Sequence, residues 1–238
     1  AAQQLADSTL GLTPSTRHVS FRDGMVYDRR RPEEVLPFGI LCDLARRERI
    51  SLGARGFFAT PGIDFNRETG RGTPFFYFTQ GAAVAEVVLD RFTGELSVPR
   101  VDLLIDIGKS INPGVDRGQI IGGFVQGMGW ATTEALVYGD DGTLLSYSPT
   151  TYKIPGSTDV PPIFNVDLLA RHDNVQNIRR SKAVGEPPLM HAIAVWAAAK
   201  NALAYESAEA AAALNLPATG EEILRCLGAA EREPSFSA

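Results

Sequence analysis

The stretch from Val115 to Val137 constrains the fold more than any other part of the sequence. Its apolar residues recur at near-helical spacing, which predicts a helix. The same stretch carries the glycines Gly118, Gly122, Gly123, Gly127 and Gly129. Each glycine inside a helix costs about 1 kcal/mol relative to alanine, so the backbone of this helix must come close to something else.

Extended and helical patterns follow one another irregularly around this stretch. Small and β-branched residues in 82–90 and 96–107 flank the turn pair Thr93-Gly94 and predict two paired strands. Residues 164–169 alternate as a further strand, and Pro187-Pro188 opens an alanine-rich helix. Because no regular strand–helix–strand repeat links these elements, we predict an α+β fold.

The remaining elements are predicted from local signals. Residues 19–27 form a hairpin around Asp23-Gly24, and residues 37–49 form a helix. Glycine, proline and polar residues in 60–73 predict a long surface or inter-subunit loop. The last, alanine-rich helix is expected to bury one stripe, formed by Leu189, Ile193, Trp196, Ala197 and Leu203.

Charge, cysteine content and hydropathy exclude several classes of function. A formal net charge of -5, with scattered basic residues, argues against nucleic acid as the main partner. Cys42 and Cys226 lie far apart in the sequence, so a cysteine-ligated metal or iron–sulfur site cannot form within the chain. No run approaches the roughly 20 apolar residues that cross a bilayer, and no signal peptide opens the chain. We therefore expect a cytoplasmic protein without a membrane segment.

Gln126 is a candidate ligand-binding residue within Gly122–Gly129. Neighbouring glycines have no side chains that would block a ligand beside it. A glutamine side chain offers two donors and an acceptor, which suits the polar edge of a heterocycle. Tight helix packing explains the same glycines equally well.

Glu186 is a candidate catalytic residue between Gly185 and Pro187-Pro188. Gly185 permits an unusual backbone, the prolines stiffen the chain, and the flanking residues can exclude water. Together they would hold the carboxylate in a fixed pose, ionised and able to act as a general base near neutral pH. The alternative is a carboxylate that only balances the positive end of a helix dipole.

Five segments in this order resemble the molybdenum hydroxylase family, and its xanthine dehydrogenase and oxidase branch in particular. They are Thr79-Gln80-Gly81-Ala82-Ala83-Val84-Ala85-Glu86-Val87, Ile111-Asn112-Pro113-Gly114-Val115-Asp116-Arg117-Gly118-Gln119, Gly122-Gly123-Phe124-Val125-Gln126-Gly127-Met128-Gly129, Thr151-Tyr152-Lys153-Ile154-Pro155 and Lys182-Ala183-Val184-Gly185-Glu186-Pro187-Pro188. The motif-bearing region runs from about residue 53 to 204. The last two segments favour the xanthine dehydrogenase branch over the carbon monoxide and aldehyde branches.

The resemblance implies a molybdopterin-binding α+β domain with two intertwined subdomains, of which residues 1–238 form the C-terminal part. Glu186 is then the general base, and Gln126 and Gly185 lie at the molybdopterin cofactor, with no side chain of this chain ligating the metal. Glu186 takes a proton from the hydroxyl group that attacks an electron-poor ring carbon of a purine, hypoxanthine or xanthine. Water is the source of the oxygen atom.

The resemblance also implies partners. The rest of the molybdenum-binding subunit, 2Fe-2S clusters and FAD on other domains or subunits, NAD as electron acceptor and a higher oligomer are expected. The chain opens at Ala1 like the middle of a helix, so we expect a fragment that does not hold molybdopterin alone. The alternatives are a hydroxylase of another N-heterocycle or an aldehyde, and a non-catalytic structural subunit.

Overall fold

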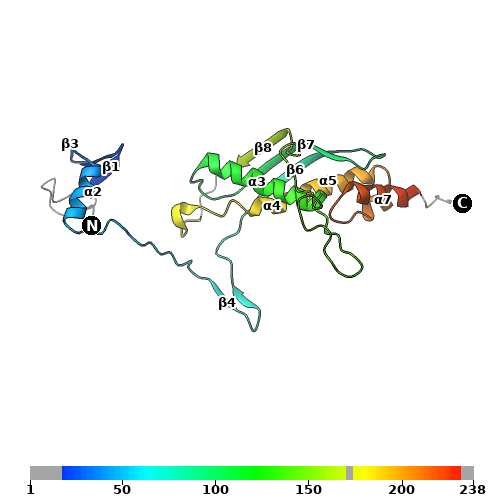
Figure 1. The fold of residues 1–238 in the computed structure, drawn as a ribbon, viewed down its shortest axis with the longest axis horizontal. Coiled ribbons are helices and arrows are strands. Elements are labelled where there is room, and N and C mark those ends of the chain that lie inside the picture. The colour runs from blue at the N-terminus through cyan, green and yellow to red at the C-terminus, as the bar shows by residue number, and fades with distance from the viewer. Residues whose placement is uncertain (1–17, 170–173, 232–238) are drawn as a thin grey trace. The chain divides into compact units, whose positions relative to one another are not determined.

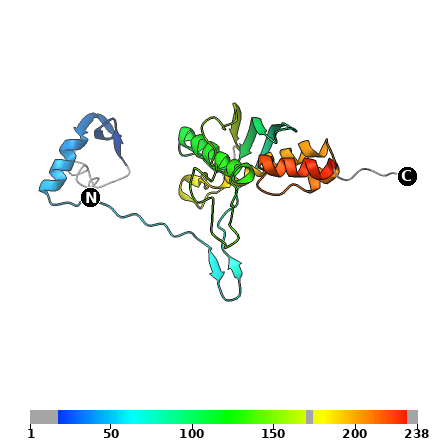
Figure 2. The same ribbon diagram turned by 45° about the vertical axis from the view of Figure 1, so that its right-hand side comes forward.

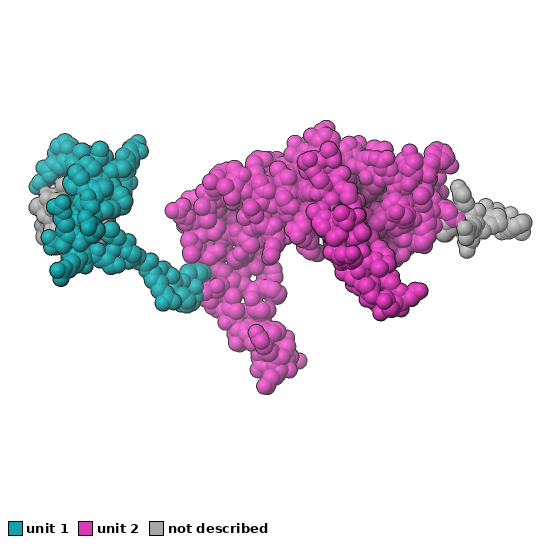
Figure 3. All heavy atoms as spheres, viewed as in Figure 1, with its two compact units in different colours: residues 1–59 teal, residues 60–238 magenta. Residues whose placement is uncertain are grey.

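The computed structural model describes residues 18–169 and 174–231. These residues separate into two compact units, 1–59 and 60–238 (Figure 3). Both units combine helices and strands, which confirms the predicted α+β class. Each unit consists of consecutive residues. The expected pair of intertwined subdomains stays a prediction. The opening residues that suggested a fragment lie outside the described residues.

The first unit is a small antiparallel sheet with one helix. Its strands, in the order β1-β2-β3, and its helix have these bounds: β1 Val19–Arg22, β2 Met25–Asp28, β3 Arg31–Pro37 and α2 Phe38–Arg47. The turn between β1 and β2 uses Asp23 and Gly24 at φ 50° and 74°, the backbone that an Asp-Gly hairpin requires. Val26 and Leu41 are fully buried where the helix covers the sheet. The predicted hairpin and helix are both confirmed.

The second unit is built on a three-stranded sheet in the order β6-β7-β8 (Figure 1). Its strands are β6 Gly81–Leu89, β7 Leu96–Ile105 and β8 Ile163–Leu168. The β6 and β7 strands are antiparallel, as predicted, whereas β7 and β8 are parallel. Parallel neighbours need a long crossover, and the chain between β7 and β8 contains α3 (Pro113–Thr132), the predicted glycine-rich helix.

Two helices cover one face of this sheet (Figure 2). Ile120, Phe124 and Met128 of α3 enter one buried cluster with Val101 and Val166 of the sheet. Val195 joins this cluster from α5 (Ile193–Ala204). A second buried cluster links α5 to α6 (Ala208–Ala212) and α7 (Gly220–Glu231).

Two predicted elements differ from the structure. Residues 60–73, predicted as a loop, contain a short exposed hairpin of β4 (Asp64–Asn66) and β5 (Arg71–Thr73). The single helix predicted from Pro187 is instead α4 (Pro187–His191) followed by α5, with a break at Ala192.

The buried face of α5 was predicted only in part, since Leu203 is buried as expected but Ile193 and Trp196 are only partly buried. Val195, Ala199 and Leu203 are its buried residues, whereas Ala197 is exposed. Nearly every residue of α5 is apolar, so periodicity alone does not define which face is buried. Because the helix is interrupted at Ala192, the side chain of Leu189 in α4 does not continue the buried stripe of α5.

Candidate functional site

Four of the five sequence motifs meet along α3. The motif that begins at Ile111 forms the start of the helix, because the Asn112 side chain accepts a hydrogen bond from the Val115 amide at 3.3 Å and Pro113 takes the first position. The hydroxyl of Ser110 donates to the Asp116 carboxylate at 2.5 Å and fixes the first turn. The glycine-rich motif forms the helix interior, and the other two motifs pack against it.

Two glycines of α3 allow the segment around Glu186 to touch the helix backbone. A methyl group on Gly123 would collide with the Gly185 carbonyl oxygen, and one on Gly127 would collide with the Leu189 carbonyl oxygen. The helix-packing explanation is therefore correct for these two positions. Gly185 itself has no positive φ, so it does not use the left-handed backbone that a glycine permits. Its carbonyl is what lies close to α3.

Two other glycines of α3 face open space. A methyl group on Gly118 or Gly122 would meet nothing within 4 Å. These positions share a helix face with Gln126, since residues four apart lie one above the other. Gly118, Gly122, Gln126 and Trp130 are all exposed in this chain. The glycines of α3 thus serve two faces: one packs against the Glu186 segment, and the other is bare.

The bare face fits a flat polar group such as molybdopterin. Without a Cβ at Gly122 or Gly118, a ring can approach the helix backbone beside the Gln126 amide. Within the described residues, the side chain of Gln126 has no hydrogen bond or ion pair, so its donors and acceptor are available.

Glu186 immediately precedes α4 and is exposed. Its carbonyl accepts a hydrogen bond from the Leu189 amide at 3.0 Å, but its carboxylate does not cap the helix. The structure therefore places the Glu186 segment on α3 at Gly123, one turn before Gln126, with the carboxylate uncommitted to any group in the described part of the chain.

Sequence reasoning missed three residues that hold this segment. Lys182 pairs with Asp106 in the interior, and the Tyr77 hydroxyl accepts a hydrogen bond from the Ala183 amide at 2.7 Å. Lys182 belongs to a recognised motif, and an aspartate at the end of an apolar strand was a visible signal for Asp106. Nothing in the sequence pointed to Tyr77.

The fourth motif, residues 151–155, binds the C-terminal end of α3 and lies at a different place. The Tyr152 hydroxyl donates to Glu134 at 2.7 Å, and this hydrogen bond is the main cause of the raised pKa of Tyr152. The Thr133 hydroxyl donates to the Lys153 carbonyl at 2.8 Å. Pro155 lies against Gly129, where a methyl group would collide with it.

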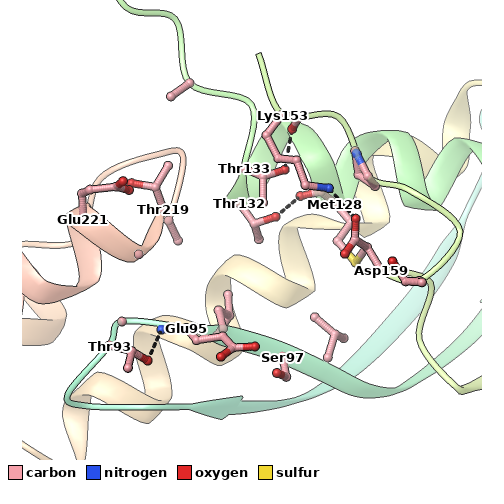
Figure 4. A pocket seen from close by; sticks show the side chains of 18 of the residues that line it. Thr93, Glu95, Ser97, Met128, Thr132, Thr133, Lys153, Asp159, Thr219 and Glu221 are labelled. Atoms are coloured by element: carbon pink, nitrogen blue, oxygen red, sulfur yellow. Dashed lines mark hydrogen bonds and ion pairs between the residues drawn. The ribbon is translucent and has the colours of Figure 1, made fainter. Parts of the chain in front are cut away.

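This end of α3 borders a cavity of about 820 Å³ (Figure 4). Its walls come from the turn between β6 and β7, the C-terminal turns of α3, the 151–162 loop and the start of α7. Lys153 and Asp159 lie at its edge as an ion pair of 2.6 Å, which is the main reason why the pKa of Asp159 is lowered. Neither Gln126 nor Glu186 lines this cavity.

No group of three or more histidine, cysteine, aspartate or glutamate side chains in 18–169 and 174–231 is arranged to hold a metal ion. Within the same ranges, no helix combines the length and apolar character needed to cross a bilayer.

Comparison with known proteins identifies the family. The family described as the molybdopterin cofactor-binding domain matches residues 1–161, including residues before Gly53 where the motifs are weak. Xanthine dehydrogenase from rice is 47% identical over 187 residues, which cover 74% of this chain and 14% of that protein. The chain thus corresponds to a small part of the curated relatives that it matches.

Solved structures agree. Quinoline 2-oxidoreductase from Pseudomonas putida 86 superposes with a TM-score of 0.66 at 25% identity, covering 98% of this chain and 28% of that protein. Aldehyde oxidoreductase from Desulfovibrio gigas superposes with a TM-score of 0.60 at 27% identity, covering 78% and 20%. On the family match and these likenesses together, the chain belongs to the molybdopterin cofactor-binding domain family of the molybdenum hydroxylases.

Proposed function

We propose that this chain is part of a xanthine dehydrogenase-type enzyme that hydroxylates purines, with Glu186 as the general base. The observation that carries the proposal is the contact between Gly185 and Gly123, which joins the Glu186 segment to the face of α3 that leads to Gln126. Identity of 47% to a xanthine dehydrogenase supports the substrate class.

The residues of this chain have distinct tasks in the proposal. Gln126 hydrogen-bonds the polar edge of molybdopterin, and the bare backbone at Gly122 lets the group approach. Gly185 sets the distance between the base and α3 through its close backbone contact. When bound, the cofactor supplies the two-electron oxidation, with water as the source of the oxygen atom.

Glu186 accepts the proton that is released as oxygen is transferred to an electron-poor ring carbon. An uncommitted carboxylate has the capacity to do so, because no arginine, lysine or helix amide in the described residues holds its oxygens. Further segments of the enzyme would exclude water from it and complete the substrate pocket. The iron–sulfur and flavin domains that pass electrons to NAD, the higher oligomer and the cytoplasmic location belong to the same proposal.

The test is Glu186→Gln in the assembled enzyme, with molybdenum content shown to be normal. Glutamine keeps the size and hydrogen-bonding capacity but cannot accept the proton, so the rate of enzyme reduction by xanthine in a single turnover should fall about 10²- to 10⁴-fold. Glu206→Gln is the matched control, because Glu206 is half-exposed and pairs with Arg91 at 3.6 Å, outside this segment. A Glu186→Gln rate within a few-fold of the unaltered enzyme would remove Glu186 from the chemistry.

The second candidate is hydroxylation of another N-heterocycle or of an aldehyde. The likeness to quinoline 2-oxidoreductase over 98% of this chain favours the first of these, and the likeness to an aldehyde oxidoreductase favours the second. Reduction rates with xanthine, quinoline and an aromatic aldehyde, measured on one preparation, separate these substrates. A third possibility, a non-catalytic scaffold, is consistent with the exposure of Glu186 in this chain and predicts no effect of Glu186→Gln.

A further inference from the structure

We propose that the buried ion pair of Lys182 and Asp106 is a positioning element for Glu186, an inference that rests on the proposed function. Lys182 lies four residues before Glu186, and Asp106 directly follows β7. Both are positioning residues, because each acts through the backbone that leads to the base and not on the substrate.

The pair is well enclosed. The Lys182 ammonium lies 2.5 Å from the Asp106 carboxylate, and only 8% and 2% of the two side chains are exposed. The ammonium also donates to the Phe78 carbonyl at 2.9 Å. A buried charge is costly unless it is paired and hydrogen-bonded, so the lysine side chain is confined to this place.

Asp106 is itself fixed to the end of the sheet. Its carboxylate accepts a hydrogen bond from the Gly108 amide at 2.8 Å, and its own amide donates to the Gln80 carbonyl at 2.8 Å. These two hydrogen bonds fix the position of Asp106 independently of Lys182. The anchor of Lys182 is therefore tied by hydrogen bonds to the end of the sheet.

The backbone from Lys182 to Glu186 is held at every residue. The Lys182 amide donates to the Ile107 carbonyl at 2.8 Å, and the Ala183 amide donates to the Tyr77 hydroxyl at 2.7 Å. Val184 packs against the main apolar cluster, and Gly185 lies against Gly123. Glu186 thus ends a segment with a well-anchored backbone, whereas its own carboxylate makes no hydrogen bond or ion pair within residues 18–169 and 174–231.

Positioning and mere stabilisation predict different results. If the pair only stabilises the fold, its loss lowers activity by the same factor whether or not residue 186 can accept a proton. If the pair positions the base, its loss has little further effect once the base is absent, because residues that act as a unit are non-additive. A misplacement of about 1 Å can cost up to about 10²-fold in rate, so the effect is large enough to measure.

The experiment is a double-mutant cycle of Lys182→Met and Glu186→Gln in the assembled enzyme, with rates expressed per bound molybdenum. We expect Lys182→Met to lower the single-turnover reduction rate roughly 10- to 100-fold, and to change it less than about three-fold in the Glu186→Gln background. Lys153→Met is the matched control, since Lys153 also pairs with an aspartate but is 60% exposed and lies in the 151–155 motif. It should leave the rate unchanged.

A second readout does not depend on activity. Hydrogen exchange in residues 181–186 should become faster in Lys182→Met. Without the ion pair, the hydrogen bonds from the amides of residues 182 and 183 to the Ile107 carbonyl and the Tyr77 hydroxyl should open more often. Lys153→Met should change exchange only around residues 151–159. Tyr77→Phe removes one hydroxyl and gives a smaller effect of the same kind, and it decides the question if Lys182→Met protein does not take up molybdenum.

The outcomes separate the two proposals. Full activity of Glu186→Gln overturns the proposed function, whatever Lys182 does. If Glu186→Gln is inactive but Lys182→Met, or Tyr77→Phe in its place, leaves rate and exchange unchanged, the positioning role is overturned. An equal rate loss in both backgrounds also overturns it, in favour of a purely structural pair.

Discussion

Two recognised motifs each contain a lysine that pairs with an aspartate, and the two pairs lie in opposite environments. Lys182 and Asp106 are separated by 76 residues in sequence and are almost completely buried. Lys153 and Asp159 are six residues apart, 60% and 41% exposed, at the edge of the cavity beside α3. One pair joins distant parts of the chain, and the other closes a local loop.

The difference in burial means that two lysine–aspartate pairs can contribute differently to stability and to the architecture. In water, an exposed pair contributes little, because the charges are screened and the side chains lose freedom. In the interior, removal of one partner leaves the other charge without compensation. We therefore associate Lys182 with the architecture around Glu186, and Lys153 with the shape of one loop.

The largest predicted effect on stability tests this difference directly. Lys182→Met should lower the local free energy of opening by about 3–5 kcal/mol, because Asp106 is left buried and unpaired. The measurement is native-state hydrogen exchange at the Lys182 and Gly108 amides in the assembled enzyme. Lys153→Met, measured at the Tyr152 amide, should cost less than about 1 kcal/mol. Equal costs for the two variants would contradict the comparison.

The glycines of α3 provide a second, smaller contrast. Gly123→Ala should destabilise the contact between α3 and the Glu186 segment by about 1–3 kcal/mol, because the methyl group collides with the Gly185 carbonyl. Gly122→Ala should instead stabilise the helix by up to about 1 kcal/mol, since its methyl group meets nothing within 4 Å.

Hydrogen exchange at the Leu189 amide and molybdenum analysis measure this pair of variants. Gly122→Ala should keep or gain stability yet lower the molybdenum content of the assembled enzyme, because its methyl group lies on the face assigned to the cofactor. Normal molybdenum content in Gly122→Ala would place the cofactor elsewhere on the protein.

The sequence predicted the parts of this structure that depend on local signals. The Asp23-Gly24 hairpin, β6, β7 and α3 follow from turn residues and periodicity. The break at Ala192 did not, because an all-apolar helix carries no signal for its buried face. The glycines of α3 revealed that something comes close to the helix. Which face meets Gly185 and which is bare depends on packing between residues far apart in sequence.

The candidate site was predictable to a similar extent. Gln126 and Glu186 were recognised from motifs, whereas the anchoring of Glu186 by Asp106 and Tyr77 was not. These residues precede Lys182 by 76 residues and Ala183 by 106 residues, so only the folded chain brings them together. Periodicity contains no information about contacts of that range.

The smallest predicted effect concerns the exposed pair and its dependence on pH. Lys153 is the main cause of the lowered pKa of Asp159, whose ordinary value is 3.8. A carboxyl group with a lowered pKa in the folded state stabilises the fold above its unfolded pKa, and loses this contribution as pH falls through its folded pKa. The cost of Lys153→Met should therefore be constant between about pH 7 and pH 5, and shrink as the pH falls below the ordinary pKa of the carboxyl group, 3.8. Hydrogen exchange at the Gly156 amide, which donates to Asp159 at 2.7 Å, measures it after correction for the intrinsic exchange rate. If the cost is the same at all pH values, the lysine acts there through the packing of its aliphatic stem and not through its charge.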